Sequence, residues 1–256
     1  MNCDVHAYLG NSPAWAQLGL PLPFDAPRWV EMMNRSGVDR ALVAPPGVGG
    51  AQDFKPDMDR IALGMQDFPD RLYGFCRVKP RRGQIAIDEL RHRVEDQNCR
   101  AIKMNTLDDD YRLDDRRLLD PVIEAADDLG IVVFFHTGDK HGDTCQPSMV
   151  ADIASDFPDT TFIIGHCGYT GYESQTVPAL KTASNTVCET AGLLTPSKIQ
   201  AIVDEVGATR VLVGSNGPNT PIELPHIMVN KYMNKLTDAE KALITGGNFE
   251  RILGLS

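Results

Sequence analysis

Short apolar runs alternate along the chain with longer stretches in which apolar and polar residues recur at helical spacing. The apolar runs, which predict strands, are Asn2–His6, Arg40–Ala44, Leu72–Val78, Ala101–Met104, Ile131–His136, Thr161–His166, Thr186–Glu189 and Arg210–Gly214. The stretches between them predict helices at Ala26–Ser36, Asp57–Phe68, Ile85–Glu95, Leu118–Leu129, Ser148–Asp156, Val177–Thr182 and Ser197–Val206. Continuous apolar strands separated by helices indicate a parallel sheet with both faces covered.

The number of strand–helix units decides the architecture. Eight units in 256 residues favour a closed (β/α)8 TIM barrel over an open doubly wound sheet. A last helix is predicted around Ala242, because Thr237 and Glu240 have the spacing of a capping box. No linker, low-complexity tract or repeat interrupts the pattern, so we expect a single domain over residues 1–256. The segment Pro45–Gly50 is expected to form a loop over the barrel mouth.

Composition narrows the classes of partner. The net charge of −10 and the pI of about 5.0 argue against a broad attraction to nucleic acid or to an anionic membrane. No apolar run approaches the ~18 residues of a membrane span, and the first residues lack the pattern of a signal peptide. The six cysteines are scattered without a CxxC pair, which predicts reduced thiols in a cytoplasmic protein.

Polar residues stand at the carboxyl ends of the predicted strands. In a barrel these ends converge on one pocket. Histidines occur at three of them, and the further candidates are a lysine, a glutamate and an asparagine: His6, His136, His166, Lys103, Glu189 and Asn216. Three imidazoles from separate strands suit either a divalent metal such as zinc or acid/base work near neutral pH. His92 and His226 lie outside the strands and are expected at the surface.

Five motifs around these residues resemble the amidohydrolase superfamily, in particular its amidohydrolase-related branch. The matching segments, in the family's order, are Asp4–Gly10, Phe135–Gly138, Ile164–Gly168, Val213–Pro218 and Gly247–Gly254. The resemblance runs over nearly the whole chain. It implies a barrel enzyme, a metal-dependent hydrolase, lactonase or non-oxidative decarboxylase, acting on a small carboxylated substrate. It further implies that His6 and His136 bind the metal and that His166 activates the water or the substrate.

Two positions depart from the family's pattern. Tyr8 stands where the family has a second metal-binding histidine, and Asn216 stands where it has an aspartate that binds the metal and takes a proton from water. An amide is a poor ligand and no general base. His6 and His136 fall short of the three protein ligands of a usual catalytic zinc, so we expect zinc to be weakly bound or absent. Restoring both family residues is expected to restore tight binding.

Replacement ligands are conceivable in the loop after the fifth strand. His141, Asp143 and Cys145 lie there, but their spacing matches no standard metal site. The alternative is that this loop is a mobile polar lid.

The remaining candidates each have two interpretations. Lys103 could bind a substrate carboxylate or act as a base, or it could simply pair with Glu189, which could otherwise serve as a general acid/base. Tyr8 could donate a hydrogen bond to the substrate or merely fill the vacated space. Arg77, near the end of the third run, could clamp an anion or be a solvated side chain.

Three functions follow from these residues. The first is an enzyme that hydrolyses or decarboxylates a small carboxylated or lactone substrate, with His166 as the acid/base. The second is a metal-free lyase or isomerase on the same scaffold, run by His166, Glu189 and Lys103. The third is a barrel without catalysis that binds a small molecule or a partner protein. A homo-oligomer is compatible with each.

Overall fold

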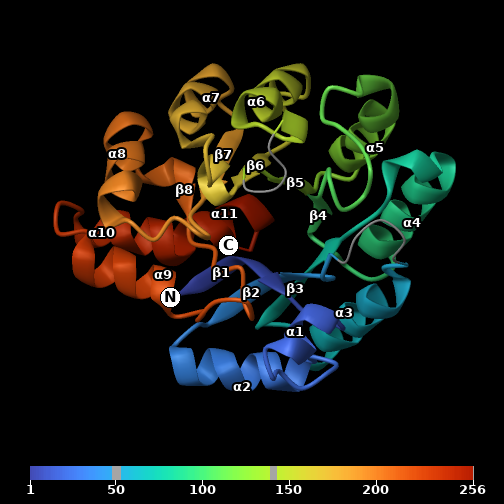
Figure 1. Ribbon diagram of the computed structural model, residues 1–256, viewed down its shortest axis with the longest axis horizontal. Coiled ribbons are helices and arrows are strands. Elements are labelled where there is room, and N and C mark those ends of the chain that lie inside the picture. Colours follow the sequence, from blue (N-terminus) through green and yellow to red (C-terminus); the bar gives the residue numbers. More distant parts are fainter. Residues whose placement is uncertain (48–52, 139–142, 256) are drawn as a thin grey trace.

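The computed structural model describes residues 1–47, 53–138 and 143–255, and its centre is a parallel sheet of eight strands in sequence order. The strands are β1 (Cys3–Tyr8), β2 (Arg40–Ala44), β3 (Leu72–Cys76), β4 (Ala101–Met104), β5 (Val132–His136), β6 (Phe162–Gly165), β7 (Thr186–Glu189) and β8 (Val211–Leu212). Figure 1 shows the strands in the middle of the molecule with the helices around them.

The first strand and the chain after the last strand close the sheet into a barrel. Val5 N–H donates to Val213 O at 3.0 Å, Asn216 N–H donates to His6 O at 2.8 Å, and Tyr8 N–H donates to Gly217 O at 2.8 Å. We call these three main-chain bonds the seam. With the helices between the strands, they confirm the predicted (β/α)8 barrel.

Helices connect the strands. The larger ones are α2 (Ala26–Ser36), α3 (Lys55–Asp67), α4 (Gln84–Glu95), α5 (Arg116–Asp128), α6 (Pro147–Asp156), α7 (Thr176–Thr182) and α8 (Pro196–Val206). Shorter ones are α1 (Pro13–Gln17), α9 (Leu224–Ile227), α10 (Asp238–Ala242) and α11 (Asn248–Leu253). The predicted capping box of Thr237 and Glu240 is present at the start of α10. None of the described helices is long and apolar enough to cross a membrane.

Strand ends differ from the prediction at the seam and also at β3, which ends at Cys76 and not at Val78. β1 runs on to Tyr8, because Ala7 and Tyr8 pair with residues 43 and 44 of β2. β8 ends at Leu212, because from Val213 onward the main chain bonds to β1 instead of β7. The seam thus positions residues 6–8 beside residues 213–217.

Two smaller expectations have mixed outcomes. His92 is exposed on α4, as expected, but the expectation for His226 is wrong, since only 4% of this residue is accessible on α9. In the predicted loop Pro45–Gly50, Pro46 and Gly47 line a cavity at the barrel mouth, while residues 48–52 lie outside the described residues.

Candidate active site

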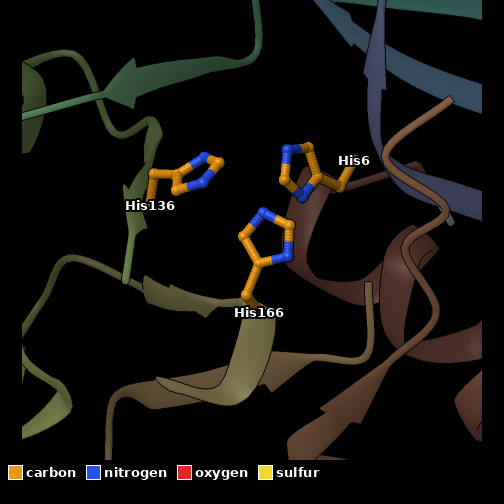
Figure 2. Close-up of side chains that lie close together, drawn as sticks. All are labelled: His6, His136 and His166. Carbon is orange, nitrogen blue, oxygen red and sulfur yellow. The ribbon is translucent and has the colours of Figure 1, made fainter. Parts of the chain in front are cut away.

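Three histidines from three strands meet at the carboxyl end of the barrel. His6 lies on β1, His136 is the last residue of β5, and His166 directly follows β6. One ring nitrogen of each lies within 4.8 Å of the others, and all three residues are buried. Figure 2 shows the rings directed toward one another. The predicted convergence of these side chains is therefore present in the structure.

His6 bridges a carboxylate and an amine. Its Nδ1 lies 2.9 Å from Glu189 Oε1, and its Nε2 is hydrogen-bonded to Lys103 Nζ and lies 3.1 Å from Tyr8 Oη. A carboxylate accepts and an ammonium donates. These partners therefore place the ring proton on Nδ1 and leave the Nε2 lone pair to the amine and the hydroxyl.

Glu189 is held by three donors. Besides His6, Oε1 accepts the N–H of His166 at 2.5 Å, and Oε2 accepts the N–H of Ala191 at 2.6 Å. These bonds tie the end of β7 to the start of the segment after β6. Because both oxygens are already bonded, Glu189 acts first as a fixed acceptor that orients His6 and the His166 main chain.

Lys103 lies behind the cavity among aromatic rings. Its Nζ is 4.1 Å from the ring centre of Phe134 and 4.6 Å from that of Tyr8. Burial lowers the pKa of Lys103 well below its usual value, and the charge of Glu189 opposes that shift. Within the described chain no ion pair joins Lys103 to Glu189 directly, since the His6 ring stands between them. The direct pairing considered from the sequence is thus replaced by a bridge through imidazole.

His166 presents a ring nitrogen that is available for chemistry. Its Nδ1 lies 2.8 Å from Ala191 O, so this nitrogen carries the proton and Nε2 carries the lone pair. Nε2 is buried and has no hydrogen-bond partner among the described residues. Burial lowers the pKa of His166 to about 3, against which Glu189 acts in the opposite direction. At neutral pH the ring is therefore an uncharged base.

Three residues at the site have a left-handed backbone conformation that is rare for residues other than glycine. His166, Cys167 and Asn216 have φ values of 62°, 48° and 62°. Non-glycine residues in this left-handed region cost about 1–3 kcal/mol each, and such residues cluster at functional sites. The turn after β6 and the turn after β8 therefore both hold a side chain at the barrel mouth at a cost in stability.

Asp4 is a site residue that the sequence did not single out by itself. Its carboxylate accepts the N–H of His6 at 3.0 Å, the N–H of Ser215 at 2.9 Å and the hydroxyl of Ser215. Burial raises the pKa of Asp4 to about 7. Its position two residues before His6 was the available signal, and its role is to fasten the seam behind the histidines.

A cavity of about 220 Å³ opens above the histidines. Most of its walls are polar: Tyr8, Ser12, Ala14, Trp15, Pro46, Gly47, Asn105, Asp108, His136, His166, Asn216 and Asn219. Asn216 Oδ1 is buried and has no partner among the described residues. Sequence reasoning missed Asn105, Asp108 and Asn219, which lie two and five residues after Lys103 and three residues after Asn216.

Arg77 lies beside this cavity but does not line it. Its guanidinium makes two bonds to Asp109, at 3.0 and 3.1 Å, and stacks 4.4 Å from the ring centre of Phe54. Asp108, which does line the cavity, is 3.6 Å from the same guanidinium. The side chain is buried, so the solvated alternative is wrong, while its role as an anion clamp stays a prediction.

The donor set does not fit the metal centre implied by the family pattern. Within the described residues, the three histidines are the one group close enough to share an ion. The His6 Nε2 lone pair faces Lys103 and Tyr8, and position 216 offers a neutral amide. Asp143 accepts hydrogen bonds from Tyr172 at 2.8 Å and from Gln146, and His141 lies outside the described residues.

Comparisons of sequence and of structure show which known proteins this chain is similar to. A family model described as amidohydrolase matches residues 2–255. A comparison with curated protein sequences gives no match. Among solved structures, a 2,6-dihydroxybenzoate decarboxylase in complex with 2,6-dihydroxybenzoate has a TM-score of 0.78 at 15% identity, covering 99% of this chain and 98% of that one.

Two further structures contain manganese. A 5-carboxyvanillate decarboxylase from Novosphingobium aromaticivorans has a TM-score of 0.78 at 16% identity, covering 99% of this chain and 97% of its own. A dihydroxybenzoic acid decarboxylase from Polaromonas, bound to the inhibitor 2-nitroresorcinol, has a TM-score of 0.75 at 14% identity and the same coverages of 99% and 97%. At these identities the likeness shows the fold alone.

Proposed function

The chain belongs to the amidohydrolase family, and we propose that it is a non-oxidative decarboxylase of a small aromatic carboxylate that carries a neighbouring hydroxyl. The expectation of an enzyme of amidohydrolase type is confirmed at the level of the family. Similar folds that act on dihydroxybenzoate and carboxyvanillate support the substrate class. The cavity of about 220 Å³ lies below the roughly 300–1,000 Å³ of drug-sized pockets, which suits a molecule of one ring.

One observation carries the proposal: His166 lines the cavity as a neutral imidazole whose Nε2 lone pair is unused. Such a nitrogen can take a proton from a substrate and return it. General acid/base help of this kind contributes about 10²- to 10⁴-fold to a rate.

Decarboxylation fits the residues better than hydrolysis does. Hydrolysis needs a strongly activated water, and the family's aspartate for that task is Asn216 here, whose amide accepts no proton at neutral pH. Decarboxylation needs a proton delivered to carbon, which one well-placed imidazole can provide. Asn216 and Asn105 then supply amide groups for the substrate's oxygens.

The proton path can be written in full. The ring hydroxyl gives its proton to His166 Nε2, and the substrate carboxylate nearby stabilises the imidazolium. The imidazolium protonates the ring carbon that bears the carboxylate, as the phenolate electron pair moves into the ring. The bond to the carboxylate carbon then breaks, its electrons return to the ring, and CO₂ leaves. The phenolate takes one proton from water, so one carboxylate and one proton give one arene and one CO₂.

The proposal includes the conditions in which the protein works. We propose that zinc, or another divalent metal, binds weakly or not at all. All six cysteines are buried and unpaired, which supports the reducing cytoplasm as its location. A small molecule remains the expected partner.

The test is a panel of hydroxybenzoates assayed for CO₂ release in D₂O. The expected product carries one deuterium at the carbon that lost its carboxylate, and His166→Ala should slow its formation by about 10²-fold or more while His92→Ala, on exposed α4, should not. Lactones are assayed alongside. Lactone hydrolysis without CO₂ release would make the reaction type wrong. Tight binding of 2-nitroresorcinol without any turnover would favour a barrel that only binds.

A further inference from the structure

The His6 nitrogen that would bind a metal already has a hydrogen-bond partner. A histidine binds a metal through a ring lone pair. Nδ1 of His6 holds its proton against Glu189, so Nε2 is the lone pair that remains. Lys103 Nζ donates into it, and Tyr8 Oη lies 3.1 Å away. His136 and His166 line the cavity, whereas His6 does not.

We propose that the Lys103 amine takes the place of the metal ion at this centre, so that Lys103 and a divalent metal compete for His6. The amine is completely buried and packs on the rings of Phe134 and Tyr8, whose faces attract a cation. Glu189 supplies the opposite charge on the far side of the His6 ring. A metal ion would have to displace the amine from His6 Nε2, because one lone pair cannot serve both partners.

The amine is a positioning residue, since it acts through His6. Its N–H fixes the His6 tautomer, that tautomer donates to Glu189, and Glu189 accepts the main-chain N–H of His166. The inference goes beyond the proposed function, because the competition for His6 holds whichever substrate the cavity takes.

The experiment measures metal affinity instead of turnover. Fresh wild-type protein, Lys103→Met and the control Lys55→Met are titrated with Co²⁺, whose visible absorption reports imidazole ligation, and dialysed against Zn²⁺ for elemental analysis. Lys55 is an exposed lysine, 3.9 Å from Asp59, so its loss changes the charge equally. Lys103→Met should bind about 10- to 100-fold more tightly than wild type, the scale for changing a group next to a ligand. Adding His136→Ala should cancel the gain, and Lys55→Met should behave as wild type.

A second arm keeps the test valid if Lys103→Met does not fold. The variant Tyr8→His with Asn216→Asp restores both family residues but keeps Lys103, and it should still bind zinc weakly. This outcome differs from the one expected from the sequence, where these two changes suffice. Near-stoichiometric zinc in this variant or in dialysed wild type would overturn the proposal, as would equal affinities of Lys103→Met and wild type. Mass spectrometry must confirm that the wild type keeps its amide at Asn216.

Discussion

The site has two sides that differ in access and in charge. On the closed side, His6, Lys103 and Glu189 are fully buried and bonded to one another. On the open side, His136 and His166 are 8% and 6% accessible and line the cavity. The closed side holds Lys103 and Glu189 around His6, whereas the open side offers the neutral imidazole of His166, the amides of Asn105 and Asn216, and the carboxylate of Asp108.

Because of this difference, we expect one side of the site to govern stability and the other to govern turnover. Charges that are buried and bonded on every side are costly to disturb, so the closed side should govern stability. The neutral His166 imidazole, with its unused Nε2 lone pair, can exchange protons with a substrate, so the open side should govern turnover.

Removing the closed side's carboxylate should have the largest effect. Glu189→Ala leaves three buried donors without an acceptor and Lys103 without a counter-charge. We expect the free energy of unfolding to fall by about 3–5 kcal/mol, as when one partner of a buried pair is lost. Urea unfolding measures it, with Glu205→Ala on the exposed end of α8 as control. A loss below about 1 kcal/mol, the scale of one surface pair, would contradict the division.

Removing the open side's base should act on rate instead. His166→Ala is expected to lower kcat by about 10²-fold or more, which corresponds to about 2.7 kcal/mol of activation free energy. Steady-state kinetics on the substrate found by the panel measures this. Unchanged kcat would remove His166 from the mechanism, and a pure rise in KM would give it a binding role only.

Stability should fall with acid because of the buried histidines. An unfolded chain takes up a proton on each histidine near pH 6.5, whereas burial holds the pKa of folded His166 at about 3. The unfolded state therefore binds more protons between these values, and stability present above about pH 6.5 is lost as the pH falls toward 3. Between pH 7 and pH 5 each such histidine contributes about 2 kcal/mol.

Single substitutions show which histidine causes the loss of stability in acid. His166→Asn should remove about 2 kcal/mol of the change in unfolding free energy between pH 7 and pH 5. His226→Asn should remove a similar amount, because burial lowers the pKa of His226 to about 4 on α9, away from the cavity lining. A pH slope that survives His166→Asn intact would show that the folded ring accepts its proton above pH 5.

The smallest effect is expected at Tyr8, where the two sides meet. Tyr8→Phe removes one bond to His6 Nε2, and Lys103 still donates to the same atom. The free energy of unfolding should change by at most about 1 kcal/mol, the net contribution of one hydrogen bond. Thermal unfolding checks it. A loss above about 2 kcal/mol would mean that Tyr8, rather than Lys103, is the main partner of His6.

The open side was largely predictable from the sequence. Barrel topology puts every strand end at the same mouth, so placing His136 and His166 at strand ends was enough to bring them together. The strand pattern also located all eight strands, with errors of one or two residues at their ends, both where the seam replaces sheet pairing and at the end of β3. These features follow from the period of the apolar residues and from the closure of the barrel.

The closed side was not predictable in the same way. That Lys103 and Glu189 bond to opposite nitrogens of one ring depends on side-chain reach and rotamer, which no strand pattern contains. The sequence offered a direct pair between them as the simplest way to satisfy two buried charges. Asn105, Asp108 and Asn219 were missed for a related reason. They lie in loops, where turn geometry decides which side chains line a cavity, and the spacing of apolar residues does not predict that geometry.

The seam also has a consequence for how this protein can change. Tyr8 and Asn216 are anchored by their main chains, through Tyr8 N to Gly217 O, Trp29 Nε1 to Tyr8 O and Asn216 N to His6 O. Since no side-chain atom of either residue belongs to the seam, both side chains can be exchanged while the barrel stays closed. In the genetic code, tyrosine and histidine differ by a single base, and so do asparagine and aspartate. A few point mutations therefore separate this site from one that binds a metal ion, and Lys103 is the residue whose replacement decides whether the ion can bind.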